Sequence, residues 1–228
     1  MPMSQPTSEF IFFRLKPSVR PEDPTNEEGE RLLSIFRNTQ HESGHQSSAW
    51  GRSAEDNNTV VWAINWTDAR ASASIEHLTP YLDPDAPPPK AIYATLSPPL
   101  CSADALIDNP VTELCTLSFA DSLSVPEKRQ LNGNLIDFRT ALVKQLPEGS
   151  RPISWSMGHV DRPGSVQHAK SPSGQAVLYL LVVGWESIDV HNKSRETEQF
   201  VSSISPIREK SLGAIPGLEL KHVSFQKT

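Results

Sequence analysis

Residues 175–200 read QAVLYLLVVGWESIDVHNKSRETEQF. The first eleven residues are almost entirely apolar and rich in β-branched and aromatic side chains, which is typical of a strand buried on both faces. This run ends at Trp185, and the polar residues that follow indicate a helix that carries His191. The same order occurs earlier in the chain, where NTVVWAINW ends at Trp66 and TDARASAS follows. The sequence therefore predicts two similar units, each with a buried strand that ends in tryptophan and precedes a helix.

The remaining elements of the two halves follow a matching order. An apolar run opens each half, and a helical pattern follows it, clearest from Leu131 to Leu142. The predicted strands are residues 9–15, a strand around Trp50, residues 58–66 and residues 90–97, then residues 111–119, a strand around Trp155, residues 175–185 and residues 218–225. The order βαββαβ in each half is that of the ferredoxin-like unit. We therefore expect an α+β fold with a first unit at residues 1–97, a linker at residues 98–110 and a second unit at residues 111–228.

One stretch, HESGH at residues 41–45, matches the H-E-x-x-H pattern of zinc hydrolases. In those enzymes both histidines lie on one continuous helix. Here Gly44 lies six residues before Trp50, just as Gly149 lies six residues before Trp155. Both glycines are therefore expected in the loop after the first helix of each half, where a helix commonly ends on a residue with positive φ. We expect no metal site, and we expect His41 and His45 to be exposed loop residues.

The composition limits the class of protein. The chain has 228 residues, 37% of them hydrophobic, and a net charge of -6. It is long enough to bury a core, and it lacks the basic stripe typical of nucleic-acid-binding proteins. The two cysteines, Cys101 and Cys115, form no C-x-x-C pair, and no apolar run is long enough to cross a bilayer. Because the N-terminus also lacks a secretory pattern, we expect a cytoplasmic protein with no nucleic-acid or membrane partner.

These features together resemble the dimeric α+β barrel superfamily, which includes antibiotic-biosynthesis monooxygenase-like and stress-responsive A/B-barrel domains. The resemblance spans residues 9–226. It is strongest in the second half, where the strand ending at Trp185 is followed by Ser187, then His191, and further on Phe200. The motif is moderately specific for this fold and weak for any one activity.

The first half departs from this motif. It keeps Trp66, but Asp68 and Ser72 stand where the second half has the serine and the histidine. The second half is therefore the better candidate for a functional site. A four-stranded sheet with helices on one face leaves its other face to be covered, so we expect the two sheets to pack against each other as an intramolecular pseudo-dimer. Whether further copies associate stays open.

In this superfamily the substrate cavity generally lies between the sheet and the helices of one unit, and strand alternation indicates which side chains point there. An imidazole among apolar neighbours can serve as a general base or acid near neutral pH. By alternation His222 shares a face with Leu218 and Leu220. The predicted catalytic residues are His222, which ranks first, and His159, Tyr179 and His191; the predicted substrate-binding residues are Trp155, Trp185 and Met157.

Two classes of function fit these residues. The first is an enzyme of secondary metabolism that acts on a hydrophobic, aromatic or polyketide-like small molecule, such as a cofactor-independent monooxygenase or a polyketide cyclase. Both reactions need an apolar cavity with one or two acid–base groups. The second is a ligand-binding or stress-response barrel without chemistry. The sequence has no nucleotide-binding motif, and we expect no cofactor. Some members of the superfamily bind haem through a histidine, for which His191 is the candidate.

Overall fold

The computed structural model describes residues 6–100 and 104–228. The strands of half one, residues 6–97, are β1 (Thr7–Arg14), β2 (His45–Arg52), β3 (Thr59–Trp66) and β4 (Lys90–Ser97). Those of half two, residues 111–228, are β5 (Val111–Ala120), β6 (Ser154–Arg162), β7 (Val166–Gln167), β8 (Gln175–Trp185), β9 (Lys221–Val223) and β10 (Gln226–Lys227). The helices are α1 (Glu27–Asn38), η1 (Thr39–His41), η2 (Ile75–Tyr81), α2 (Asp104–Ile107), α3 (Val125–Thr140), η3 (Ala141–Gln145), α4 (Ile188–Arg195) and α5 (Glu198–Lys210). Cys101 and the first five residues lie outside the described part of the chain, so the predictions made for them are not tested by the structure.

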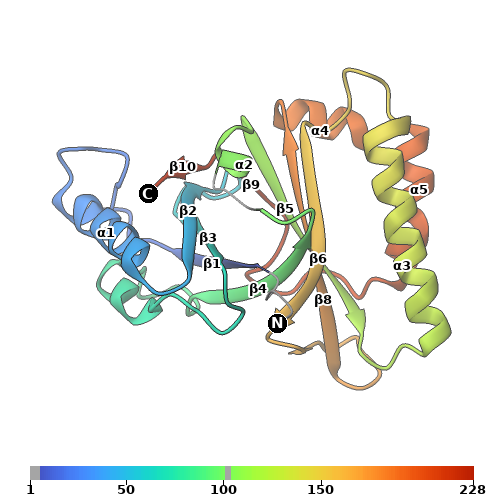
Figure 1. Ribbon diagram of the computed structural model, residues 1–228, viewed down its shortest axis with the longest axis horizontal. Coiled ribbons are helices and arrows are strands. Elements are labelled where there is room, and N and C mark those ends of the chain that lie inside the picture. Colours follow the sequence, from blue (N-terminus) through green and yellow to red (C-terminus); the bar gives the residue numbers. More distant parts are fainter. Residues whose placement is uncertain (1–5, 101–103) are drawn as a thin grey trace.

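The described strands join into one barrel. Antiparallel pairing follows the order β10-β2-β3-β1-β4-β6-β8-β5-β9, with β7 beside β8. The two ends of this path, β9 and β10, follow each other in the chain, and Ser53 just after β2 forms a bridge with Val223 of β9. The path therefore closes on itself, and Figure 1 shows its strands between two outer layers of helices.

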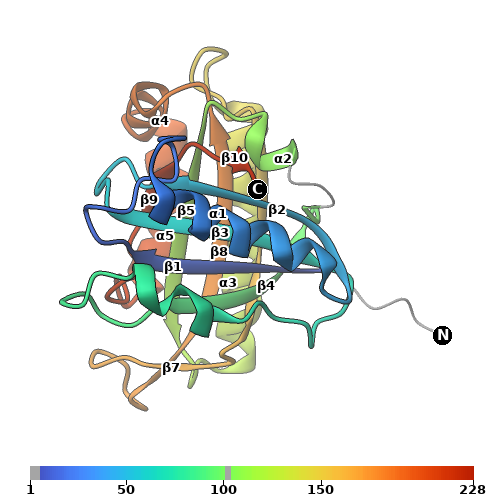
Figure 2. The ribbon, with the colours of Figure 1, turned by 90° about the vertical axis from the view of Figure 1, so that its left-hand side faces the viewer.

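Strand alternation separates the inside of the barrel from the outside. Phe10 and Phe12 of β1 belong to the apolar cluster inside the barrel, whereas Ile11 and Phe13 pack in the cluster beneath α1. A third cluster lies between β5, β8 and the helices α3 and α5. Figure 2 shows α1 crossing the strands of half one on their outer face. The predicted α+β barrel is confirmed, while the exact unit boundaries at residues 97 and 111 stay predictions.

Two seams join the halves, and a glycine permits close approach of the backbones at each one. At the β4–β6 seam, a Cβ on Gly158 would lie 1.8 Å from the carbonyl oxygen of Thr95. At the seam between β2 and the C-terminal segment, a Cβ on Gly51 would lie 2.3 Å from the carbonyl oxygen of Ser224. The strands of the two halves therefore face each other across the barrel as expected, but they are also joined edge to edge into one continuous sheet, which the sequence did not indicate.

Several local predictions are wrong. No α-helix begins after Trp66. Residues 67–74 are irregular and lead into the short 3-10 helix η2. This helix contains Pro80, which has no backbone N–H to donate to a helical hydrogen bond. The predicted strand at residues 218–225 is reduced to β9, since the chain turns at Gly217 with a φ of 83°, and β10 begins only after it. Leu218 consequently packs inside the barrel and does not share a face with His222.

The HESGH stretch does not form a zinc-hydrolase helix. His41 ends η1, His45 begins β2, and Gly44 between them has a φ of 88° as predicted. His41 is exposed, but His45 is partly buried with its ring edge-on to Trp66 at 5.9 Å, so the prediction of an exposed loop is wrong for His45. Gly149 does not have the positive φ that was predicted, because η3 ends at Leu146 in an extended conformation.

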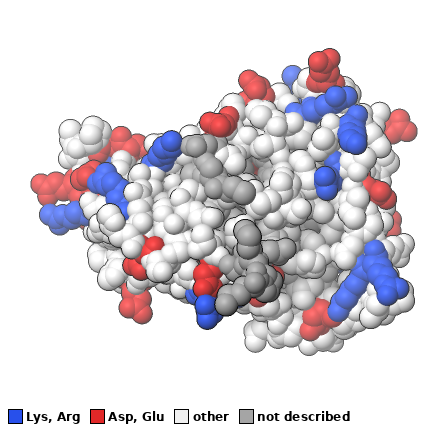
Figure 3. All heavy atoms as spheres, viewed as in Figure 1, with Lys and Arg blue, Asp and Glu red and all other residues white. Residues whose placement is uncertain are grey.

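The surface agrees with the modest net charge. Figure 3 shows lysine and arginine side chains interspersed with aspartate and glutamate side chains on one face. No helix within residues 6–100 and 104–228 is both long and apolar enough to span a bilayer.

Replacing Gly158 by alanine tests the closeness of the β4–β6 seam. The new methyl group must displace the backbone of Thr95, so Gly158→Ala should lower the free energy of unfolding by about 1–3 kcal/mol, as overpacking does. In contrast, a Cβ on Gly133 of α3 meets no atom within 4 Å, and Gly133→Ala should stabilise the protein by up to about 1 kcal/mol. Urea unfolding measures both values. A Gly158→Ala protein as stable as the wild type would contradict this seam.

Candidate functional site

A cavity of about 90 Å³ lies in half two between the sheet and the helices. Polar groups at its inner end come from β5 and α4, and apolar side chains from β8, α3 and α5 form its walls. The lining residues with polar atoms are Glu113, Cys115, Trp185, His191, Arg195 and Arg208, and the principal apolar ones are Phe138, Leu142, Leu181, Val183, Phe200 and Ile204. The cavity is therefore in the half and in the layer that the sequence predicted.

The cavity exists because half two has smaller side chains than half one at paired positions. In half one Trp62, four residues before Trp66, pairs with Ile11 across β1 and β3. In half two Leu181, four residues before Trp185, pairs with Cys115 across β5 and β8. Trp62 fills its layer and packs against the ring of Phe36 at 4.5 Å. Leucine and cysteine at the paired positions leave the corresponding space of half two open.

Glu113 is a buried carboxyl group at the inner end of the cavity. The indole Nε1 of Trp185 donates a hydrogen bond to Glu113 Oε2 at 3.0 Å. Burial raises the pKa of Glu113, and the Trp185 hydrogen bond and the charge of Arg195 offset this only in part. Glu113 is therefore biased toward its neutral, protonated form.

His191 lies beside Glu113, with Nε2 3.4 Å from Glu113 Oε2. The side chain of Ser187 caps α4 by accepting a hydrogen bond from the Val190 amide, and the resulting helix places the His191 ring in a stack with Trp185 at 4.9 Å. Burial, together with His222 and Arg195, lowers the pKa of His191 to about 3. An imidazole whose pKa is lowered thus faces a carboxyl group whose pKa is raised.

His222, the first-ranked candidate, lies behind the cavity and does not line it. Its Nε2 is 2.7 Å from His191 Nδ1, and its Nδ1 is 2.6 Å from Glu55 Oε1. Glu55 follows β2 in half one and is 167 residues away in the sequence. The side chain of His222 therefore contacts the cavity-lining side chain of His191 and does not itself line the cavity.

Three further polar groups lie on the cavity wall. Burial raises the pKa of the Cys115 thiol, with Glu113 adding to the shift, so Cys115 is a weak nucleophile. Arg195 and Arg208, both exposed residues, also line the cavity. Their two positive charges favour a ligand that carries or develops negative charge.

The other predicted site residues fall into two places. Trp185 lines the cavity, but His159 and Tyr179 form a separate pair: the Tyr179 hydroxyl contacts His159 Nε2 and lies 2.6 Å from Asn132 Oδ1. Burial raises the pKa of Tyr179 to about 12 and lowers that of His159. Trp155 and Met157 pack against the same outer cluster without lining the cavity, and Arg139 lies 4.4 Å above the Trp155 ring.

Half one repeats the buried carboxyl group without the histidines. Trp66 Nε1 donates to Glu9 Oε2 at 2.8 Å, as Trp185 does to Glu113. Tyr93 pairs with Glu9 across β1 and β4, where half two pairs His222 with Glu113. The Tyr93 hydroxyl interacts with Glu9 and Ser72. The two histidine rings of half two are thus replaced by two hydroxyl groups.

Several residues in and around the candidate site were missed from the sequence. Glu9 and Glu113 carried a signal, because each is a charged residue inside an apolar strand. Arg195 and Arg208 gave no signal beyond exposed helix positions. Glu55 gave none, because its contact with His222 requires the register of the seam between the halves.

Haem does not fit this site. Both ring nitrogens of His191 are directed at protein groups, Nδ1 at His222 and Nε2 at Glu113, and Trp185 covers one ring face. A haem macrocycle is also several times larger than the 90 Å³ cavity. Among residues 6–100 and 104–228, no group of three or more histidine, cysteine, aspartate and glutamate side chains is arranged to hold a metal ion.

Solved structures share this fold over nearly the whole chain. A proposed monooxygenase from Lactobacillus acidophilus is 10% identical, and the match covers 97% of this chain and 94% of that one with a TM-score of 0.52. An anthrone oxidase-like protein is 12% identical with 99% and 92% covered and a TM-score of 0.56. A proposed chlorite dismutase is 9% identical with 99% and 96% covered and a TM-score of 0.53. No protein-family profile and no curated protein matches the sequence. The chain has the fold of these proteins, a dimeric α+β barrel.

The buried carboxyl group predicts a specific pH dependence. Because the folded-state pKa of Glu113 lies above its ordinary value of 4.5, the folded protein binds this proton more tightly than the unfolded chain. The contribution of Glu113 to stability is therefore largest at low pH and is lost as pH rises through the raised pKa. Glu113→Gln should remove that loss and increase stability at neutral pH relative to the wild type, measured by urea unfolding between pH 4 and pH 8.

Glu127 is the matched control with the opposite sign. Hydrogen bonds from Ser124 lower its pKa to about 2, so Glu127 contributes stability above the ordinary pKa of glutamate that is lost at lower pH. Glu127→Gln should destabilise the protein at neutral pH. A Glu113→Gln protein that responds to pH like the wild type would show that Glu113 is not held protonated.

Proposed function

We propose that this protein is an enzyme that binds a small phenolic or enolisable aromatic molecule in the cavity of half two and removes a proton from it. The observation that carries the proposal is the buried His191 imidazole. Its low pKa keeps it neutral and makes it a weak base that takes up a proton only transiently, its Nδ1 contacts His222, and its Nε2 is directed at Glu113 at the inner end of the cavity. This is the arrangement of a general base whose tautomer is set by a second group.

The side chains of the cavity walls determine which kind of molecule can bind beside His191. Leucine, isoleucine, valine and phenylalanine side chains surround the space, which favours an aromatic ring over a polar molecule. The volume of about 90 Å³ is smaller than the roughly 150 Å³ apolar cavity that holds benzene. A single ring thus fits after small side-chain movements, and a polycyclic polyketide would need α5 to move.

The arginine side chains that line the cavity support the same chemistry. Removing a proton from a phenol or an enol leaves a negative charge that Arg195 and Arg208 stabilise electrostatically. Glu113, whose raised pKa favours its protonated form, is placed to return a proton to the substrate later in the reaction. The acid and the base are therefore two adjacent groups whose pKa values are shifted in opposite directions.

The names of the structural neighbours add a candidate for the overall reaction. A monooxygenase that needs no cofactor uses dioxygen as co-substrate: a ring CH₂ group loses two hydrogens and gains one oxygen atom as a carbonyl, and the other oxygen atom leaves as water. Deprotonation of the substrate by His191 is the step that this chain's residues supply. A ligand-binding barrel without chemistry shares the cavity but not the proton transfer.

4-Nitrophenol distinguishes these two functions, because its visible absorption appears only when it is ionised. We expect the wild-type protein to bind it and to ionise it at a pH where the free phenol is neutral. His191→Gln should retain binding but lose this ionisation. For a true substrate the same variant should lower kcat/KM by about 10²–10⁴-fold, the usual effect of losing a general base.

Two further variants make the test specific. His159→Gln changes a histidine of half two outside the cavity and should leave ionisation unchanged. Leu181→Trp introduces the side chain that fills half one and should abolish binding while the protein stays folded. Bound but neutral 4-nitrophenol in the wild type would indicate a binding protein, and ionisation that survives His191→Gln would exclude His191 as the base.

A further inference from the structure

Four side chains form a continuous chain of contacts from the cavity of half two to half one. Glu113 Oε2 lies 3.4 Å from His191 Nε2, and His191 Nδ1 lies 2.7 Å from His222 Nε2. His222 Nδ1 then lies 2.6 Å from Glu55 Oε1. Each histidine thus uses both ring nitrogens. The proposed reaction at His191 does not by itself require Glu55.

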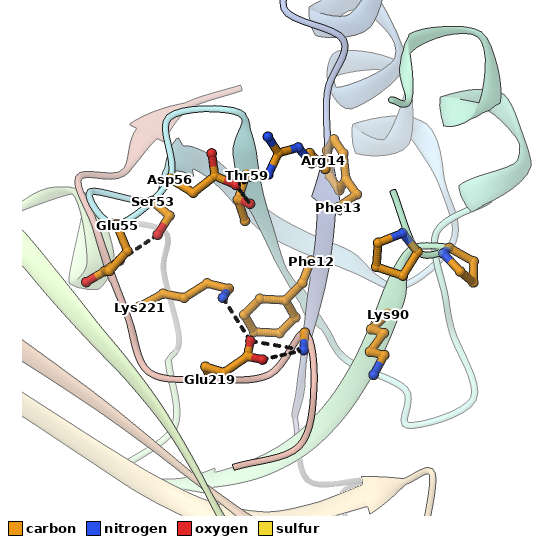
Figure 4. A pocket seen from close by; sticks show the side chains of 13 residues that line it. Phe12, Phe13, Arg14, Ser53, Glu55, Asp56, Thr59, Lys90, Glu219 and Lys221 are labelled. Carbon is orange, nitrogen blue, oxygen red and sulfur yellow. Dashed lines mark hydrogen bonds and ion pairs between the residues drawn. The ribbon is translucent and has the colours of Figure 1, made fainter. Parts of the chain in front are cut away.

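This row of four side chains is buried at its two histidines and exposed to solvent at Glu55. The side chains of His191 and His222 are 2% and 7% exposed, whereas that of Glu55 is 41% exposed. Glu55 lines a second pocket of about 240 Å³ at the surface, shown in Figure 4. The chain therefore connects a buried cavity with a water-accessible pocket on the other side of the seam.

Glu55 is held in place from half two as well as from its own loop. The backbone amide of His222 donates to both carboxylate oxygens of Glu55, at 3.1 and 3.0 Å, and the Ser53 hydroxyl donates to Oε2 at 2.5 Å. Other charged side chains of the pocket pair with one another: Arg14 with Asp56, and Lys221 with Glu219. Within this pocket Glu55 is thus the carboxylate that contacts His222. Figure 4 shows Glu55 beside Ser53.

One assignment of protons satisfies every group. Ionised Glu55 accepts the Nδ1 proton of His222, and His222 Nε2 accepts the Nδ1 proton of His191, so the lone pair of His191 Nε2 faces the cavity and Glu113 Oε2. When His191 Nε2 takes a proton from the substrate, its Nδ1 proton passes to His222 Nε2, and the Nδ1 proton of His222 passes to Glu55. Three bonds to hydrogen break and three form, and neither ring retains a charge. Transfer in the reverse direction returns the proton.

We propose that Glu55 of half one is the solvent end of a proton pathway that crosses the seam through His222 and His191 to the cavity. This inference rests on the proposed function, because the substrate supplies the proton. Burial acts to raise the pKa of Glu55, but hydrogen bonds from Ser53 and His222 outweigh it and lower the pKa overall. A proton delivered to Glu55 is therefore released readily to water. Glu55 acts only through His222 and is a positioning residue, not a catalytic one.

The pathway is tested without any substrate by NMR of the full chain labelled with ¹⁵N-histidine. Glu55→Gln keeps the shape of an exposed side chain but removes its charge. The ring N–H signal of His222 should move, and the signal of His191, which does not touch Glu55, should move with it. Glu219→Gln in the same pocket, where Glu219 contacts Gly217 and Lys221, is the control and should move neither. A His191 signal unchanged in Glu55→Gln would overturn the pathway.

Stopped-flow measurement of proton release on binding of 4-nitrophenol tests the transfer itself. Glu55→Gln should slow proton release by about tenfold to a hundredfold without changing the equilibrium affinity, and added acetate should restore the rate. Glu219→Gln should release protons at the wild-type rate. If the wild type does not ionise the phenol, the proposed function is wrong and the NMR result still decides the pathway. If it does, and Glu55→Gln releases protons at the wild-type rate, the pathway is wrong.

Discussion

The pairing of one short C-terminal segment, residues 221–227, with both halves is the constraint on which the rest of the structure depends. β9 pairs with β5 and β10 pairs with β2, so this segment closes the barrel. The backbone amide of Ala54 donates to the carbonyl oxygen of His222 at 2.8 Å and fixes the loop after β2 against β9. That hydrogen bond places Glu55 beside His222, and β9 in turn places His222 beside His191. The same segment therefore closes the barrel and positions the four contacting side chains that lead from Glu55 to the cavity.

The two halves share one backbone arrangement, but the space between the sheet and the helices is filled in half one and left open in half two. Both bury a glutamate that accepts a hydrogen bond from the tryptophan at the end of the long strand. Burying a carboxyl group is costly unless it is paired or neutral, and each half retains it. In half one large aromatic side chains occupy the adjacent space, whereas in half two Leu181 and Cys115 leave a cavity. The histidines occur in the half with the cavity, which is the asymmetry expected when one half carries the chemistry and the other is a scaffold.

Much of this arrangement could be predicted from the sequence. Apolar runs that end in Trp66 and Trp185 indicated the central strands, and the motif after Trp185 placed His191 on a helix over the sheet. Alternation failed for Leu218, because the turn at Gly217 breaks the strand, a local event that periodicity does not record. Glu55 could not be predicted, since its partner is 167 residues away and depends on which strand edges meet. The size of the cavity also depends on paired side chains in adjacent strands, which a single sequence shows only once their register is known.

Amide hydrogen exchange at the seam tests the central claim most directly. Residue-resolved NMR of the full chain should show the amides of Ala54 and His222 exchanging slowly, with the same opening free energy as amides of the central strands β1 and β5. The reason is that Ala54 donates to the His222 carbonyl oxygen and His222 to the Glu55 carboxylate. Such protection would show that the two halves are joined at the place where Glu55 of half one contacts His222 of half two. Rapid exchange of both amides in a folded protein would contradict a closed seam and, with it, the connection between Glu55 and the cavity.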